Sequence, residues 1–430
     1  MSPLNLLPFN DTCRRPGDAA KRLTPGFKFG RLAPLSVAAA LALLVGVVGC
    51  GGGGDASTTP ATPADTTPTA TASNFTQGTI TGFGSVIVNG VRFDDSSATV
   101  TDDLGLKTTL SALHLGMRVD VDSSAVDAAT ATAKAAAFRF GGQVLGPVSA
   151  LNTAANTLTV LGQVVDIASS TVFDSSLSGG LSAVLVGAVI EVHGTLDAAT
   201  GHITATRIER KTAATAYKLR GTVAALDTTL KTFTLGGVLI SYASVDSSLV
   251  PSTLANGVTL TAVLATTQSK GTWVAQSFGV KPTKPLDHTT AQLRGAITAF
   301  TSATSFTVDG LVVDATNATF PDGSTGLALG VAVEVKGTVT NGVLMATSVS
   351  LESHHQGDDS HKMQLFGAIT AVDATAMTFV VRDTTATYGS ATVYVNGTVA
   401  DLLVGRKVHV KGGVGSTRTQ VLATEVSFDH

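Results

Sequence analysis

From Phe75 onward, apolar and polar residues alternate with a period of two along most of the chain. In the segment 306–313, the Phe, Val and Leu side chains fall on one face, whereas Thr307 and Asp309 fall on the other. This alternation predicts β-strands with one buried face, and the pair Asp309-Gly310 favours a tight hairpin turn between two of them. Helical patterns are few, and Leu402-Leu403-Val404 is typical of the single turns that they predict.

Three sequence markers recur in the same order five times. The first is a glycine that begins a short β-prone run, as at Gly295. The second is G-x-x-V-x-V-x-G with substitutions, as in GVAVEVKG from Gly330 to Gly337, and the third is a run such as Ala346-Thr347-Ser348-Val349. The markers predict five β-units at 75–140, 141–214, 215–287, 288–358 and 359–430. The residues before them predict a signal segment over 1–49 and a lipidated Cys with a tether over 50–74.

Each predicted unit is small, with five or six short strands in about 70 residues. An open sheet of this size has two exposed edges, and closing it into a barrel removes them. We therefore expect an all-β protein of tandem antiparallel barrels similar to the OB-fold. The alternative is a solenoid of stacked open units, although solenoid repeats are usually about 20–45 residues long.

The N-terminal segment has the order of a secretory signal. Basic residues predominate up to Arg31, an uncharged apolar run follows over 32–48, and Val47-Val48-Gly49-Cys50 is similar to the cleavage motif of bacterial lipoproteins. Acylation of Cys50 would supply a stable membrane anchor, because two acyl chains keep a protein on a bilayer whereas one chain binds only marginally. A plain transmembrane span and a buried helix are the alternatives, but the run lies at the short end of spanning lengths.

The segment after Cys50 is composed of Gly, Thr, Pro, Ala, Ser and Asp up to residue 73, with Asn at 74, and this composition predicts a flexible tether. Gly51, rather than Asp, follows Cys50, and this favours the outer membrane in the sorting of such lipoproteins. We therefore expect a cell-envelope protein that faces the periplasm or the cell surface. After cleavage it contains no free thiol, because Cys13 is removed with the signal.

Residues 78–93 contain the run GFGSVIVNGVRF. This run resembles a bacterial family catalogued as domain of unknown function 5666 (DUF5666), and the later units share its Gly and Val skeleton. The resemblance implies a proteobacterial envelope protein with tandem units behind a lipoprotein signal. It transfers no catalytic residue, because none is established for the family.

Composition excludes several functional classes. Charged residues are only 14% of the chain, and 28 Lys and Arg stand against 31 Asp and Glu. Without a basic excess the chain is not expected to bind nucleic acid through its phosphates. Trp273 is the only tryptophan, so an aromatic stripe for stacking bases or sugars is not expected either.

The densest group of ligand-type side chains lies between the fourth and fifth units, at His354, His355, Asp358, Asp359 and His361. Imidazoles and carboxylates are ligands for divalent transition metals. A polar linker between units is the principal interpretation, because His-rich tracts are compositional signals. A linker also lacks the surrounding hydrogen-bond partners that orient metal ligands. We expect weak zinc or nickel binding there at most, and no cofactor.

Three histidines lie in or beside the second marker, at His114, His193 and His409. His193 and His409 alternate with Val, which predicts solvated, outward-pointing side chains. Acid pairs such as Asp94-Asp95 and Asp102-Asp103 are interpreted as turn formers. Nucleophile elbows and zinc-protease motifs are missing from the sequence.

The sequence therefore predicts a non-enzymatic envelope lipoprotein. Its units would act as a spacer or as a binding module for an envelope glycan or protein. The alternative is a hydrolase directed at the cell wall, or another enzyme, with a site at the interfaces between units.

Replacing Cys50 with Ala is expected to release the protein from the membrane into the soluble periplasm, because the acyl chains are the predicted anchor. Fractionation of cells that express either form, followed by immunoblotting, measures this. Retention of the variant in the membrane fraction would contradict the prediction.

Overall fold

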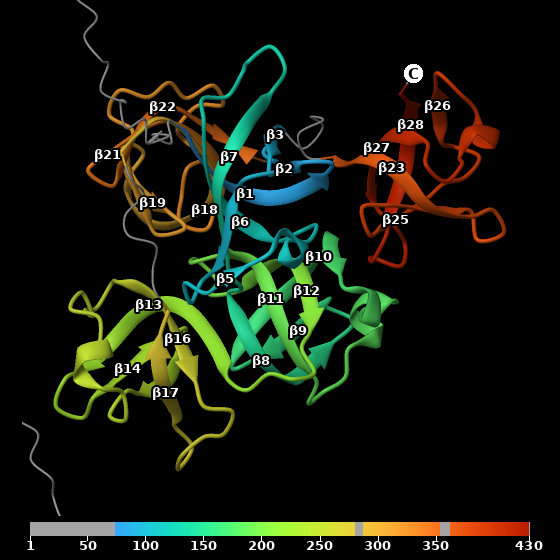
Figure 1. Cartoon of the computed structure of the whole chain (residues 1–430). Coiled ribbons are helices and arrows are strands. Elements are labelled where there is room, and N and C mark those ends of the chain that lie inside the picture. Colours follow the sequence, from blue (N-terminus) through green and yellow to red (C-terminus); the bar gives the residue numbers. More distant parts are fainter. Residues whose placement is uncertain (1–73, 280–286, 353–361, 430) are drawn as a thin grey trace, which may run out of the picture. The chain divides into compact units, whose positions relative to one another are not determined.

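The computed structural model describes residues 74–279, 287–352 and 362–429. These residues form an all-β protein of small closed barrels (Figure 1), which confirms the predicted fold class. Within these ranges, helical structure is limited to 3-10 turns, and no helix is long and apolar enough to cross a bilayer. The turns are η1 (Leu110–Ala112), η2 (Ser175–Leu177), η3 (Gly180–Ala183), η4 (Ser247–Leu249) and η7 (Val399–Asp401).

The strands group into barrels along the chain. Barrel 1 comprises β1 (Asn74–Phe83), β2 (Val86–Val88), β3 (Val91–Asp94), β4 (Thr99–Asp102), β5 (Lys107–Thr108), β6 (Arg118–Ser123) and β7 (Thr132–Phe140). Barrel 2 comprises β8 (Val144–Asn152), β9 (Thr157–Val160), β10 (Gln163–Phe173), β11 (Val189–Leu196) and β12 (Ile203–Arg210). Barrel 3 comprises β13 (Tyr217–Asp227), β14 (Thr232–Leu235), β15 (Val238–Ser241), β16 (Thr259–Leu264) and β17 (Trp273–Phe278).

The remaining strands complete two more barrels. Barrel 4 comprises β18 (His288–Ser302), β19 (Ser305–Val308), β20 (Leu311–Asp314), β21 (Ala332–Thr340) and β22 (Val343–Leu351). Barrel 5 comprises β23 (Met363–Asp373), β24 (Thr378–Val381), β25 (Thr384–Thr387), β26 (Val393–Val395), β27 (Lys407–Val414) and β28 (Val421–Phe428). The predicted unit boundaries remain a prediction.

One pairing scheme closes every barrel, and barrel 2 illustrates it. β8 pairs antiparallel with β9 and with β11, and β9 pairs antiparallel with β10. β12 then closes the barrel, antiparallel to β11 and parallel to β10. This strand order is that of the OB-fold, and it leaves no edge of the sheet unpaired.

The hairpin between the second and third strands has a two-residue turn in every barrel. In barrel 4 this is the predicted Asp309-Gly310 turn, with φ angles of 47° and 89°, between the paired residues Val308 and Leu311. Positive φ at both central residues is characteristic of the type I′ turn, which matches the twist of the flanking strands. The equivalent turns are Asn89-Gly90, Leu161-Gly162, Gly236-Gly237 and Arg382-Asp383, all with positive φ.

The two glycines of the second marker have distinct structural roles. The first precedes the penultimate strand of each barrel with φ between 84° and 89°, where a side chain would be strained; these are Gly116, Gly187, Gly257, Gly330 and Gly405. The second lies at a bulge between the penultimate and last strands in barrels 2, 4 and 5. A Cβ on Gly412 would lie 2.1 Å from the carbonyl oxygen of Leu422.

Barrel interiors are filled by the apolar half of each alternation. Phe138, Phe233, Phe379 and Phe428 are among the largest fully buried side chains. Burying one such aromatic side chain contributes about 1.5–3 kcal/mol to the free energy of folding. Valines from neighbouring strands, among them Val121, Val165 and Val335, complete the cores and are fully buried.

Strand pairing also joins separate barrels. β1 of barrel 1 runs parallel to β18 of barrel 4 and, at its other end, to β23 of barrel 5. β8 of barrel 2 pairs with β13 of barrel 3. The first strand of a barrel therefore extends beyond its own sheet and supplies hydrogen bonds to a neighbour.

Gly412 and its neighbour Gly413 provide a matched test of the bulge. Gly412→Ala is expected to lower the free energy of unfolding by about 1–3 kcal/mol, because backbone must move to admit the methyl group. Gly413→Ala is the control, because no described atom lies within 4 Å of the added Cβ. Urea denaturation of both variants measures the difference, and equal destabilisation would contradict this role of the bulge.

Candidate functional site

The polar half of each strand alternation lies on the outer surface of its barrel, where neighbouring barrels cover part of it. In barrel 2, Glu191 on β11 lies opposite Glu209 on β12, and His193 lies opposite Arg207. All four side chains are buried, with relative exposures of at most 8%. Two carboxylates directly opposite each other on a sheet are destabilising unless cations separate them.

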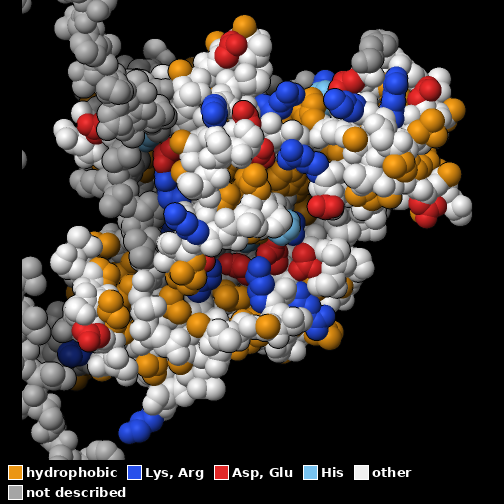
Figure 2. All heavy atoms as spheres, in the orientation of Figure 1, with side chains coloured by type: hydrophobic (Ala, Val, Ile, Leu, Met, Phe, Trp, Pro, Cys, Tyr) orange, Lys and Arg blue, Asp and Glu red, His pale blue; other side chains and the backbone are white. Residues whose placement is uncertain are grey.

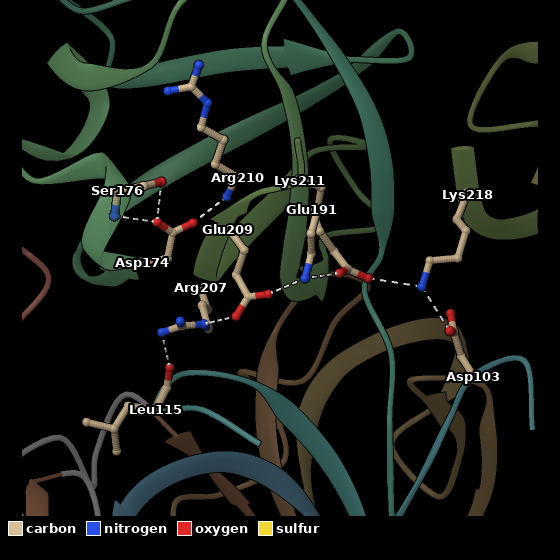
Figure 3. A network of polar contacts seen from close by, with 10 residues as sticks. All are labelled: Asp103, Leu115, Asp174, Ser176, Glu191, Arg207, Glu209, Arg210, Lys211 and Lys218. Atoms are coloured by element: carbon tan, nitrogen blue, oxygen red, sulfur yellow. Dashed lines mark hydrogen bonds and ion pairs between the residues drawn. The ribbon is translucent and has the colours of Figure 1, made fainter. Parts of the chain in front are cut away.

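Cations from barrels 2 and 3 separate these carboxylates (Figure 3). The Lys211 ammonium lies 2.6 Å from Glu209 Oε2 and 3.1 Å from Glu191 Oε2, and Arg207 pairs with Glu209. Lys218 of barrel 3 bridges Glu191, at 3.0 Å, and Asp103 of barrel 1, at 2.9 Å. We call this group the ion network.

One further hydrogen bond extends the ion network, and a separate group around Asp174 lies next to it in sequence. Arg207 donates from Nη1 to the Leu115 carbonyl of barrel 1 at 3.0 Å. Asp174 receives the backbone N–H groups of Ser176 and Arg210. Barrel 2 is thereby fastened to barrels 1 and 3 through charged groups that contact little solvent.

The cations lower the pKa of both glutamates. Burial alone would raise these pKa values, but Lys218 is the strongest of the cations that hold the pKa of Glu191 at about 2. Arg207 is the strongest of those that hold the pKa of Glu209 at about 2. Both carboxylates are therefore ionised at neutral pH.

A pocket of about 310 Å³ lies among barrels 1, 3 and 4. Its polar lining includes Arg118, Arg139 and Arg220, together with carboxylates, and its apolar lining includes Phe75 and Phe140. Arg118 pairs with Asp309 of barrel 4, and Arg220 donates to the Asp309 carbonyl at 3.3 Å. The pocket is therefore of mixed charge, and residues from three barrels form it.

Three side chains that line the pocket carry buried atoms without a hydrogen-bond partner among the described residues. They are Gln77 Oε1, Asp103 Oδ2 and Arg139 Nε. Leaving such groups unpaired costs about 1–3 kcal/mol each. A bound molecule that both donates and accepts hydrogen bonds would satisfy all three.

Two carboxyl groups of the pocket have raised pKa values. Burial raises the pKa of Asp103, against the effect of Lys218. Burial also raises the pKa of Asp120, against Arg139 and a 2.7 Å hydrogen bond from Gln77. Raised carboxyl pKa values inside a pocket are typical of functional sites, although structural ion pairs also produce them.

The three marker histidines have different environments. His114 is exposed, as expected for a solvated side chain. His409 is half-buried: its ring stacks on Phe366 at 3.7 Å, and burial lowers its pKa to about 4. For His193 the prediction of solvation is wrong, because its side chain is completely buried.

The remaining candidate residues have mixed outcomes. Asp94 and Asp102 form turns as predicted, since each accepts a backbone N–H two residues later. Asp103 differs, because it lines the pocket and pairs with Lys218. Cys50 and the group at His354, His355, Asp358, Asp359 and His361 lie outside the described residues.

The sequence alone did not reveal the pocket or the ion network, because their residues come from different units. Figure 2 shows acidic and basic side chains side by side near the middle of one face. The one local signal was charge at outward strand positions, as at Glu191 and Glu209.

Comparison with known proteins finds one family model that matches parts of the chain. The model of the domain of unknown function DUF5666 matches residues 146–209, 294–350 and 366–427, which lie within barrels 2, 4 and 5. No curated protein matches the chain. A solved structure titled "drosophila Unr CSD456" is similar with 14% identity and a TM-score of 0.13, over 51% of this chain and 98% of that chain.

Acid is expected to weaken the protein through the ion network. Glu191 and Glu209 have folded-state pKa values of about 2 against 4.5 for the free side chain, so their stabilising effect is complete above pH 4.5. It is lost progressively as the pH falls from 4.5 toward 2. Urea denaturation at pH 7, 4 and 3 measures this loss.

A variant should identify the source of the acid sensitivity. Glu209→Gln is expected to cost about 3 kcal/mol at pH 7, because it leaves the buried Arg207 guanidinium uncompensated, and to show a shallower loss of stability in acid. Glu425→Gln, at a one-third exposed ion pair, is the control. An unchanged acid dependence in Glu209→Gln would show that other groups govern it.

Proposed function

We propose that this protein is a non-enzymatic, lipid-anchored protein of the cell envelope whose barrels form a binding module for an envelope glycan. The observation that carries the proposal is the set of three unpartnered polar atoms in one pocket. Its volume is near the lower end of the range for small-molecule sites, roughly 300–1,000 Å³.

The chemistry of the pocket favours a ligand rich in hydroxyl groups. Gln77 Oε1 and Asp103 Oδ2 require hydrogen-bond donors, whereas Arg139 Nε requires an acceptor. A hydroxyl group is both donor and acceptor, and a saccharide presents several of them at fixed spacing. The apolar faces of a sugar ring would lie against Phe75 and Phe140.

Charge argues against a polyanionic ligand. Asp102, Asp103, Asp120 and Asp309 all line the pocket beside the three arginines. A phosphate backbone would meet these carboxylates as well as the cations, so nucleic acid is not the proposed partner. An uncharged or zwitterionic glycan avoids this repulsion.

The proposed location at the outer membrane also favours a glycan ligand. The signal-like N-terminal segment and Val47-Val48-Gly49-Cys50 favour lipidation of Cys50 and retention at the outer membrane. A protein held there encounters envelope saccharides at high local concentration. The tether that we propose over 51–73 would let the barrels reach them.

Binding is tested with an array of defined bacterial envelope di- to tetrasaccharides and the purified full-length protein. Gln77→Met and Arg220→Met should each lower the affinity for a bound saccharide at least ten-fold, about 1.4 kcal/mol, because each removes a polar contact in the pocket. Gln276→Met is the control, because Gln276 is exposed on β17. Absence of binding, or equal affinity in all variants, would contradict the proposal.

A hydrolase is the second candidate, and the two raised carboxyl pKa values favour it. Glycosidases use a pair of carboxyl groups, one of them protonated, on either side of the bond that they break. Asp103 and Asp120 would be that pair. Saccharide cleavage that Asp120→Asn abolishes while binding persists would establish this candidate in place of simple binding.

A further inference from the structure

His193 is a polar side chain that lies on β11 beside the ion network, opposite Arg207. It is completely buried, and neither ring nitrogen has a hydrogen-bond partner among the described residues. A buried imidazole normally has at least one partner, because an unpaired buried polar atom costs about 1–3 kcal/mol. Burial also lowers the pKa of His193, which favours the neutral ring with a free lone pair.

The ring nitrogen of His193 lies close to two carboxylates. One ligand atom each from Glu191, His193 and Glu209 lies within 4.8 Å of the other two. Ligand atoms at about 2.1 Å from a tetrahedral ion are roughly 3.4 Å from one another. The two ligand atoms that lie farthest apart here would therefore have to approach each other by at most about 1.4 Å. Small side-chain movements would therefore bring three protein ligands to one ion.

The donor set selects the kind of ion. One imidazole with two carboxylates suits a first-row transition ion such as Zn²⁺, whereas Ca²⁺ and Mg²⁺ prefer oxygen ligands alone. Three protein ligands would leave the fourth position of a tetrahedral ion for water. The strands β11 and β12 fix all three residues, which is a more rigid support than a loop provides.

Lys211 lies with its ammonium between the two carboxylates that would bind such an ion. Its ammonium contacts both carboxylates, at 2.6 Å and 3.1 Å, and its side chain is 36% exposed. In Figure 3 it lies between Glu191 and Glu209. Because it reaches this position from partly exposed surface, it can withdraw into solvent, whereas Arg207 and Lys218 stay paired on the outer sides of the two carboxylates.

We propose that Glu191, His193 and Glu209 form a transition-metal site in barrel 2, which the Lys211 ammonium occupies when no ion is bound. Binding of the ion exchanges one cation for another between the same carboxylates and gives His193 the partner that it lacks. The site is distinct from the pocket among barrels 1, 3 and 4 and does not depend on the proposed function.

Zinc titration of the full-length protein tests the site, with Zn²⁺ as the probe and calorimetry as the measurement. The background variant carries His354→Ala, His355→Ala and His361→Ala, so that this histidine group cannot contribute. We expect one Zn²⁺ in the background variant and the loss of that ion in His193→Gln. His409→Gln, at a half-buried histidine of barrel 5 that stacks on Phe366, is the matched control and should retain it.

A second variant tests the exchange with lysine. Lys211→Met should bind Zn²⁺ at least ten-fold more tightly, because no ammonium has to leave the carboxylates, whereas Lys134→Met at an exposed lysine should leave the affinity unchanged. Zinc-edge X-ray absorption should report nitrogen and oxygen ligands without sulfur. Thermal melting of each variant checks that it is folded.

The outcomes separate clearly. Unchanged zinc stoichiometry in folded His193→Gln would overturn the proposal, and so would the absence of zinc binding in both the background variant and Lys211→Met. If His193→Gln does not fold, the comparison of Lys211→Met with Lys134→Met decides: equal affinity in these two overturns the site, and tighter binding in Lys211→Met alone supports it.

Discussion

Closure of a very small sheet is the constraint on which this structure depends. Strands such as β14 and β15, four residues each, bury little unless the sheet curls until its edges meet. Closure requires a parallel contact between the third and last strands, as between β10 and β12. It also requires a tight turn before the penultimate strand and a bulge between that strand and the last one. Glycine permits the turn in all five barrels and the bulge in three of them.

Closure directs one half of every strand inward and leaves the other half free to meet other barrels. The inner half is apolar in every barrel, because the interior of a small closed barrel is filled by side chains. The outer half differs: Glu191 and Glu334 take places that Asp120 and Thr261 take in other barrels. The contacts between barrels therefore differ from one another, and the ion network and the pocket each occur at one junction.

These two halves also explain how much could be predicted. The fold class followed from the period-two alternation and the turn residues, because both act within a few residues of sequence. The environment of His193 could not be predicted in this way. Its alternation with valine places it outside its own core, but burial depends on which barrel lies against β11, and that contact joins residues far apart in the chain. The pocket was beyond prediction for the same reason.

The polar junctions also bear on whether the barrels serve only as a spacer. A spacer needs junctions that are satisfied internally, and apolar or fully paired contacts meet that need at the least cost. The junctions here instead contain buried polar atoms that lower the stability of the fold. His193 has no hydrogen-bond partner among the described residues, and neither do single atoms of Gln77 and Arg139. Such costs persist in a protein where another property depends on them. Ligands that complete these groups, a glycan at one junction and a metal ion at the other, would account for both, and a spacer would account for neither.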